Sequence, residues 1–516
     1  MKRPGVTLSS MAQQESQTHQ TDVRTLARGV GIGFLGRAVG RVLNLVSQVA
    51  VARWLGPAAF GLYSTAWNLM NLSGQIVPLG LPSGAIRFAP RYRPADPAGF
   101  KTLLFRCLGL AGLSGVIAGG AVFVSAESLA DLLQKPDLAE LLRYVAWAFP
   151  LGAIMLTLSA ATRISQRIGF SVGIEDITQP TVDLLLILLF YLVGGHLLGF
   201  MAAGVLSYLA AVIYGLYGLN HLFPDVFDRR IKLTHYPGYG ELLRFSLPTA
   251  AATMFAVLVI RVDRLIVAYL LPSAEVGVYQ AASQFSIIFA TIISAISAIF
   301  TPMVSDLFHR GQTERLQELF RVTTKWMLYL SIPPFLVTAF APRDVMVALF
   351  GAEYAAGATP LLILSLARLA HAASGAGNDL LVMAGKQNQW FAVSSSMLIV
   401  NVSLIFLLGP RWGLNGVALA TLCAMSGMFL LLSLLTRRHV GVWPYDRRYL
   451  KGLAAAAVAA LAVVLLSRLG IASPLARITL LALAATGLFA GSLWALGLDA
   501  EDRAFLGLLR ARLARR

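Results

Sequence analysis

Five arginine residues lie inside apolar stretches of the sequence that are long enough to cross a membrane. They are Arg37, Arg41, Arg261, Arg264 and Arg368. A charged side chain at the centre of a membrane-spanning helix costs about 2.5–3.5 kcal/mol, so such residues are functional candidates. Arginine presents a planar fork of donors that matches phosphate oxygens. A cavity lined by these guanidinium groups would suit an anionic headgroup such as a lipid diphosphate, and a simple sugar or a cationic drug would not need it.

The spacing of polar residues indicates which way these side chains face. Arg37, Arg41, Asn44 and Gln48 advance by four, three and four residues, which places them on one helical face. That face is too polar to meet lipid, so we expect it to contact protein or a wet cavity. Other polar residues predicted to line this cavity are Asn68, Asn71, Gln75, His371 and Asn378.

Three acidic residues, Asp183, Asp263 and Asp379, also fall within predicted spans. Each is predicted either to bind a coupling ion or proton, or to act as a counter-ion to a neighbouring arginine. A structural alternative exists for the arginines as well. Arg261, Asp263 and Arg264 would then form an ion-pair cluster near the outer end of their helix, and Arg37 would extend to the cytoplasmic surface. His371 is either a proton site or a hydrogen-bonding residue between helices.

The elements that must hold these residues are membrane-spanning helices. The chain has 516 residues, of which 57% are hydrophobic and only 13% charged, against about 25% charged in soluble domains. A span needs roughly 20 mostly apolar residues. Such segments occur near 29–52, 60–84, 103–124, 139–161, 174–193, 197–219, 245–270, 276–302, 324–341, 358–384, 391–409, 412–435, 450–468 and 475–497. The sequence therefore predicts an all-α, polytopic membrane protein with about fourteen transmembrane helices.

Basic residues predict the orientation of these spans. The net charge is +17, and the positive charges gather in alternate loops, for example Arg87 and Arg91, Arg229 and Arg230, and Arg437 and Arg438. Under the positive-inside rule these loops and both termini are cytoplasmic. The same pattern excludes nucleic acid as the expected partner, because the charges lie in short clusters between apolar runs.

An internal repeat divides the predicted helices into two sets of six. Residues 52–66 read ARWLGPAAFGLYSTA, and residues 268–282 read AYLLPSAEVGVYQAA, with matching glycines at Gly61 and Gly277 and matching tyrosines at Tyr63 and Tyr279. Two halves with the same direction imply lobes related by a pseudo-twofold axis along the membrane normal, with a substrate site between them. The predicted domains are a disordered cytoplasmic tail (1–24), an N-terminal lobe (25–222), a cytoplasmic linker (223–244), a C-terminal lobe (245–436), two extra helices (437–498) and a basic tail (499–516).

These motifs resemble the polysaccharide transporter family, which includes the Wzx-type O-antigen flippases of the multidrug/oligosaccharidyl-lipid/polysaccharide exporter superfamily. The resemblance lies in residues 52–66, Leu79-Gly80-Leu81 and Ile86-Arg87-Phe88 in the first half. In the second half it lies in residues 261–267, followed by Pro272, Glu275 and Gly277-Val278-Tyr279.

The resemblance implies a multi-pass flippase of the bacterial cytoplasmic membrane. It would move a polyprenyl-diphosphate-linked oligosaccharide from the inner to the outer leaflet, driven by an ion gradient. The product would be lipopolysaccharide O-antigen, capsule, exopolysaccharide or a wall glycan. The implied partners are the lipid-linked anionic oligosaccharide, membrane lipid, and polysaccharide polymerase or export proteins. No cofactor and no metal are expected.

Four other functions compete with this one. A multidrug or cation antiporter of the same superfamily, or a lipid II-type peptidoglycan precursor flippase, would share the fold, but five arginines against three acids disfavour a cation carrier. An enzyme acting on lipid-linked glycans generally needs a large outer domain, and no predicted outer loop exceeds about 20 residues. A primary pump would need a phosphate-binding loop, and no GxxxxGK[ST] motif occurs. A transporter is therefore predicted, and not an enzyme.

Overall fold

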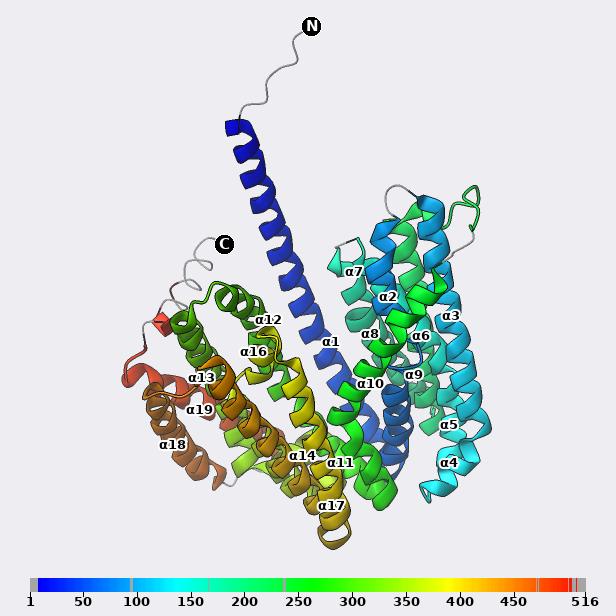
Figure 1. Cartoon of the computed structure of the whole chain (residues 1–516). Coiled ribbons are helices and arrows are strands. Elements are labelled where there is room, and N and C mark those ends of the chain that lie inside the picture. The colour runs from blue at the N-terminus through cyan, green and yellow to red at the C-terminus, as the bar shows by residue number, and fades with distance from the viewer. Residues whose placement is uncertain are drawn as a thin grey trace. The chain divides into compact units, whose positions relative to one another are not determined.

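The computed structural model describes residues 8–92, 96–165, 167–234, 238–469, 471, 473–499, 501–503 and 507, and over these residues every regular element is a helix (Figure 1). Two compact units are present. Unit 1 comprises Met1–Ser47, Leu69–Ala130 and Pro136–Val257, and unit 2 comprises Gln48–Asn68, Asp131–Lys135 and Leu258–Arg516. The predicted all-α class is confirmed. Most of the predicted basic tail, 508–516, lies outside the described residues.

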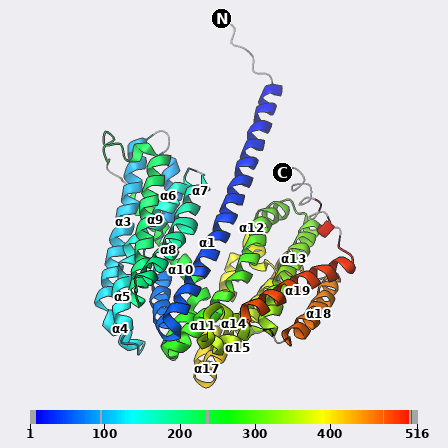
Figure 2. The ribbon, with the colours of Figure 1, turned by 180° about the vertical axis from the view of Figure 1, so that it is seen from behind.

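Unit 1 contains the first part of α1 (Leu8–Ser73) and the start of α10 (Tyr239–Leu270). Its remaining helices are α2 (Leu81–Phe88), η1 (Ala89–Arg91), α3 (Pro97–Val124), α4 (Ala126–Leu132), α5 (Leu138–Ala146), α6 (Ala148–Arg163), α7 (Ile168–Val172), η2 (Gly173–Thr178), α8 (Gln179–Leu192), α9 (Leu197–Leu222) and η3 (Pro224–Val226). Helix α6 packs between α3 and α9 (Figure 2). Helix α1 begins at Leu8, within the segment predicted as a disordered tail, where no Gly or Pro interrupts the chain before Gly29.

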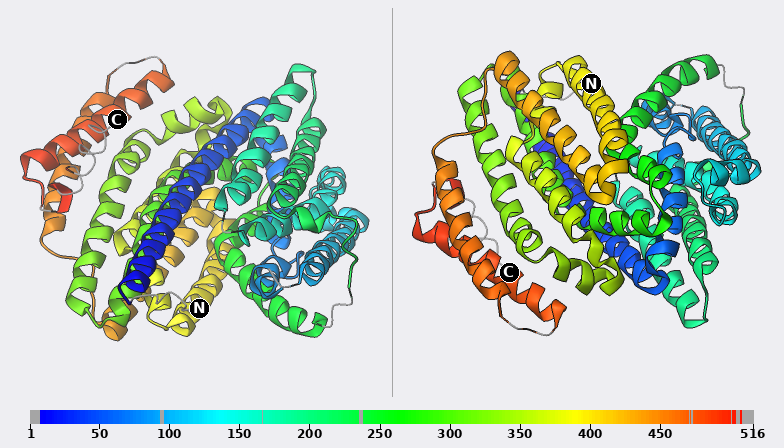
Figure 3. Two further views of the ribbon diagram at one scale, coloured as in Figure 1. Left: turned by 90° about the horizontal axis from the view of Figure 1, so that it is seen from above. Right: turned by 90° about the horizontal axis from the view of Figure 1, so that it is seen from below.

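Unit 2 contains residues 48–68 of α1, most of the second half of α10, and the later helices. These are α11 (Ser273–Phe285), α12 (Ile287–His309), α13 (Thr313–Phe340), α14 (Pro342–Phe350), η4 (Ala352–Gly357), α15 (Ala358–Ser374), α16 (Gly377–Met383), α17 (Gln387–Val440), α18 (Arg448–Ser467) and α19 (Pro474–Ala495). Helices α18 and α19, orange to red, lie beside each other in every view (Figure 3).

Among the described residues, nine helices are long and apolar enough to cross a membrane, or ten if the bent pair α13 and α14 counts as one span. The predicted count of fourteen is not confirmed as such. Two of the nine contain a break, at Gly56 (φ 74°) in α1 and at Gly413 (φ 53°) in α17. Each therefore includes two predicted spans. Pro57 follows the first break directly, and its fixed φ and missing N–H suit the first turn of the next helical segment.

The two matching glycines of the repeat pack against each other within unit 2. A Cβ atom at Gly61 would lie 1.8 Å from the Ser273 carbonyl oxygen, and one at Gly277 would lie 2.0 Å from the Pro57 carbonyl oxygen. The contact is reciprocal, as expected for two copies of one motif that meet at a twofold axis. It explains why residues 48–68, which belong to the predicted N-terminal lobe, pack within unit 2.

Side chains cap the carbonyl ends of helices beside this contact. Arg53 donates to the carbonyl oxygens of Leu349, at 2.6 Å, and Ala348, at the end of α14. Lys135 donates to the carbonyl oxygens of Leu271, at 3.0 Å, and Ala268, where α10 ends. Burial lowers the pKa of Lys135. Cations at helix C-termini satisfy carbonyl groups that have no partner within the helix.

The Leu79-Gly80 pair of the first-half motif lies directly before α2, at the end of the turn that follows α1. Both residues adopt positive φ, 54° for Leu79 and 68° for Gly80. A Cβ atom at Gly80 would lie 2.1 Å from the carbonyl oxygen of Ser246 in α10, so only glycine permits this approach. The motif therefore positions two helices of unit 1.

An ion cluster within unit 2 joins α13 and α18 to the segment that follows α19. The Lys325 ammonium group is only 1% exposed and donates to Glu501 at 2.9 Å, Asp502 at 3.0 Å and Asp499 at 3.1 Å. Lys451 also pairs with Asp499, at 2.7 Å. Burial raises the pKa of Asp499, but the hydrogen bonds from Lys451 and Lys325 outweigh it, so the net shift lowers this pKa.

Candidate functional site

The first group of predicted site residues lies in unit 1, on α1. Arg37 is exposed and Arg41 half-buried, and both interact electrostatically with Asp176 of η2. Gly40 allows α1 to pack closely against η2, since a Cβ atom at Gly40 would lie 2.2 Å from the Asp176 carbonyl oxygen. We call Arg37, Arg41, Arg163, Glu175 and Asp176 the α1 cluster.

Glu175 and Asp176 were missed by the sequence analysis. They stand at the edge of a predicted span, where acidic residues are usual, but the structure places them in a six-residue π-helix, Gly173–Thr178, next to α1. Glu175 accepts hydrogen bonds from Arg163, at 2.6 Å, and from Ser159. Single-turn π-helices are frequent at functional sites. The available signal was a pair of adjacent acids within an otherwise apolar stretch.

Asp183 occupies a different position in unit 1. Its side chain is 7% exposed and lies on α8, beside the buried hydroxyl of Ser47. Among the described residues, no basic side chain forms an ion pair with it. A buried carboxylate without a cation beside it is suited to take up a proton or a metal cation.

The second group lies in unit 2 and gathers residues from three helices. Tyr279 of α11 donates a hydrogen bond of 3.1 Å to Asp263 of α10, which joins the aspartate and tyrosine of the second-half motif. Arg368 of α15 interacts electrostatically with Asp263, Arg264 and Tyr279. His371, one turn after Arg368, stacks on Phe429 with ring centroids 3.7 Å apart. We call Asp263, Arg264, Tyr279, Arg368 and His371 the α10 cluster.

The α10 cluster leaves polar groups unsatisfied. Asp263 Oδ1, Arg264 Nε and His371 Nδ1 are buried and have no hydrogen-bond partner. Over the described part of the chain, neither Arg264 nor Arg368 has a carboxylate oxygen within the 4 Å of an ion pair. Two arginines face one aspartate, which leaves one positive charge in excess. The predicted ion-pair alternative for Arg264 therefore does not describe this geometry, whereas Arg261, half-buried on the same helix, does have an interaction partner.

The remaining predicted residues are not members of either cluster. Asn68 is buried and donates to Gln280 at 3.3 Å, so it serves packing within unit 2. Asp379 accepts a hydrogen bond from Asn378 at 3.1 Å and lies near Ser297 and Thr301 of α12. The others, which are half-buried, are Asn44, Gln48, Asn71 and Gln75.

Comparisons with known proteins identify the family of the chain. A family model described as "Polysaccharide biosynthesis protein" matches residues 50–358. The succinoglycan biosynthesis transport protein ExoT of Rhizobium meliloti is 23% identical over 357 residues, 68% of each chain. The probable flippase AglR of Haloferax volcanii is 22% identical over 413 residues, which cover 78% of this chain and 81% of that protein.

Solved structures share the fold. The lipid II flippase MurJ in an inward closed conformation has a TM-score of 0.72 at 14% identity, and the match covers 90% of this chain and 99% of that chain. An inward-facing multidrug resistance transporter of the MATE family has a TM-score of 0.66 at 15% identity, with coverage of 78% and 95%. Since the family model covers more than half of the sequence, the chain belongs to the polysaccharide biosynthesis protein family of multi-pass membrane transporters, and the resemblance seen in its motifs is confirmed.

Proposed function

We propose that the protein is a flippase that carries a polyprenyl-diphosphate-linked oligosaccharide from the inner to the outer leaflet of the cytoplasmic membrane, with both termini in the cytoplasm. One observation carries the proposal: Arg264 of α10 and Arg368 of α15 are half-buried and lack carboxylate partners among the described residues. Guanidinium groups held in that way favour an anionic ligand, and a diphosphate offers several oxygens for bidentate contacts. The names of ExoT and AglR, a transport protein and a probable flippase, support the same function.

In unit 1 the α1 cluster supplies a second cationic group. Three arginines there face two acids, so one positive charge is again in excess. Each cationic group by itself offers contacts for the diphosphate, while the polyprenyl tail remains in the bilayer. Asp183 is the proposed coupling residue, because its carboxylate lies beside a hydroxyl and can change its charge without breaking an ion pair.

The test is to replace arginines of the α10 cluster and measure export. Arg264→Gln, Arg368→Gln and the double variant keep a polar side chain but remove the charge. Loss of a charged hydrogen-bonding partner costs about 1.5–3 kcal/mol, so each single variant is expected to lower transport roughly 10–100-fold. Surface polysaccharide should fall and the lipid-linked precursor should accumulate, at unchanged protein abundance in the membrane.

A matched control is Arg310→Gln, which removes the same charge from an exposed residue that pairs only with Asp306 on its own helix. This variant should export normally. Arg368→Lys separates charge from geometry: it keeps the charge but loses the planar fork, so partial activity is expected. Normal export by the Arg264→Gln/Arg368→Gln variant would refute the proposal. A loss of cation efflux with normal glycan export would favour the antiporter instead.

A further inference from the structure

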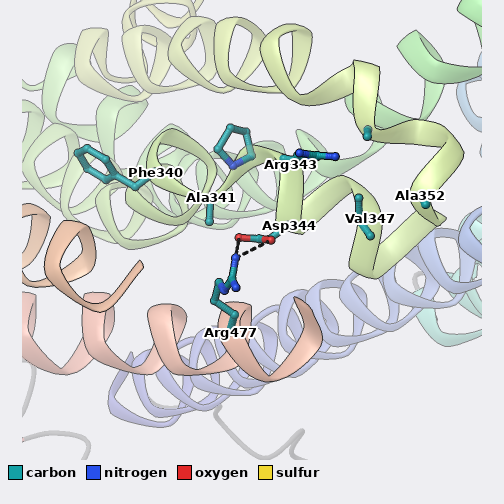
Figure 4. Close-up of a pocket in the computed structure, with 9 residues that line it drawn as sticks. Phe340, Ala341, Arg343, Asp344, Val347, Ala352 and Arg477 are labelled. Carbon is teal, nitrogen blue, oxygen red and sulfur yellow. Dashed lines mark hydrogen bonds and ion pairs between the residues drawn. The ribbon is translucent and has the colours of Figure 1, made fainter. Parts of the chain in front are cut away.

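A pocket in unit 2 lies where α13 ends and α14 begins. Helix α13 ends at Phe340, and α14 leaves it at an angle of 90°. The bend, the turn η4 and the start of α19 enclose a cavity of about 410 Å³ (Figure 4). This is large enough for a small ligand or a headgroup. None of its residues belongs to the α1 or α10 cluster.

Two arginines and one aspartate supply the charges of this pocket. Arg477 of α19 extends to Asp344 of α14, and its Nη1 atom lies 3.2 Å from both carboxylate oxygens (Figure 4). Its Nη2 atom donates to the Ile471 carbonyl oxygen at 2.6 Å, and its Nε atom is buried without a partner. Arg343 lines the same pocket, is exposed, and forms no ion pair with any residue that the structure describes. The pocket therefore carries one positive charge in excess.

The rest of the wall is apolar. Phe340, Val347 and Ala352 line it, and Phe340 is 41% exposed although it is a large hydrophobic residue. Helices α14 and α19 both start here, each with a proline in its first turn, and their N-terminal N–H groups add partial positive charge. A cationic rim beside an exposed aromatic side chain, at the end of a membrane span, fits an amphiphile with an anionic head.

We infer that this pocket binds the phosphate group of an anionic membrane lipid, with Arg343 as the residue that selects the negative charge. Arg477 is held by Asp344 and positions α19 against α14. Arg343 is the cation left for a ligand. The pocket shares no residue with the proposed transport site. Its lipid is therefore either a resident phospholipid or a polyprenyl phosphate located in the leaflet at this end of α13. Both present a phosphate ester on a lipid anchor.

The experiment measures lipid retention and thermal stability of the purified full-length protein. Native mass spectrometry and thermal unfolding are recorded with phosphatidylglycerol, polyprenyl phosphate, phosphatidylcholine or inorganic phosphate. Arg343→Gln leaves the Arg477–Asp344 pair intact. It is expected to weaken the binding of phosphatidylglycerol or polyprenyl phosphate roughly fivefold. Arg468→Gln is the matched control, because Arg468 is exposed at the end of α18, near the start of α19, and does not line the pocket.

The results separate the possible ligands. Stronger binding of phosphatidylglycerol than of polyprenyl phosphate, lost in Arg343→Gln and kept in Arg468→Gln, assigns a resident phospholipid, and the reverse order assigns the carrier lipid. Equal binding of phosphatidylcholine and phosphatidylglycerol by the wild type would overturn the inference. So would equal weakening by both substitutions, or a response to inorganic phosphate as large as the response to lipid. Because transport is not the readout, failure here is distinguishable from failure of the flippase proposal.

Discussion

The reciprocal contact between Gly61 and Gly277 yields the sharpest prediction about stability. A methyl group on Gly61 would meet the Ser273 carbonyl oxygen at 1.8 Å, and one on Gly277 would meet the Pro57 carbonyl oxygen at 2.0 Å. An ordinary contact begins near 3.4 Å, so the backbones would have to separate by roughly 1.5 Å. The obstacle is backbone and cannot rotate away. Overpacking of this kind typically costs about 1–3 kcal/mol, and the double variant reaches the upper end because both substitutions act on one crossing.

The assay is thermal unfolding of detergent-solubilised protein, followed by fluorescence, for Gly61→Ala, Gly277→Ala and the double variant. We expect the apparent Tm to fall by several degrees in each single variant. Gly120→Ala is the control, because a Cβ atom at Gly120, on α3, has no neighbour within 4 Å, and alanine favours a helix by up to about 1 kcal/mol over glycine. The control should be neutral or stabilising. If Gly61→Ala unfolds at the same temperature as Gly120→Ala, the close crossing does not exist.

Three further predictions concern single sites. Asp183→Asn should reduce glycan export to the level of a deletion strain at unchanged abundance, because an amide cannot take up a proton or neutralise a cation; wild-type export would remove Asp183 from the coupling role. Since the pKa of Asp499 is lowered in the folded state, the stabilisation by its ion pairs is present above its ordinary value of 3.8 and lost as the pH falls below that value. The apparent Tm should therefore drop between about pH 5 and about pH 3, less steeply in Asp499→Asn, and identical profiles would contradict this assignment. Tyr354→Phe removes the 2.8 Å hydrogen bond to the Ala52 carbonyl oxygen but keeps the ring contact with Phe60, so it should cost about 1 kcal/mol in thermal unfolding, and an unchanged Tm would show that the bond contributes nothing.

The fold class could be predicted from the sequence because it depends on composition and on the length of apolar runs. Not all helix boundaries could be predicted: α1 ends at Ser73 and α2 starts at Leu81, both inside the predicted span 60–84, because these boundaries depend on local backbone geometry. The start of α1 at Leu8 was also not predicted. Polar composition was taken as a sign of disorder, although no residue between Leu8 and Gly29 prevents a helix.

The candidate site was only partly predictable. Spacing along one helix placed Arg37 and Arg41 on a common face, but partners from other helices carry no sequence spacing, so Glu175 was overlooked. Tyr279 was identified as part of a sequence motif and was not predicted as a site residue. Its hydrogen bond to Asp263 depends on how α10 and α11 meet, which a single sequence does not reveal.

Lys325 differs from Arg264 and Arg368 in how fully neighbouring carboxylates compensate its positive charge. Lys325 is nearly inaccessible, and three carboxylates surround its ammonium group, as expected for a buried charge whose role is to hold helices together. Arg264 and Arg368 are half-buried, but Asp263 is the acid beside them and accepts a hydrogen bond from Tyr279 as well. A fold that can compensate Lys325 fully could have compensated these arginines too. Under the proposed function, this incomplete compensation destabilises the empty protein and would be offset by a bound anion, which is the energetic arrangement that a carrier of phosphate-linked lipids requires.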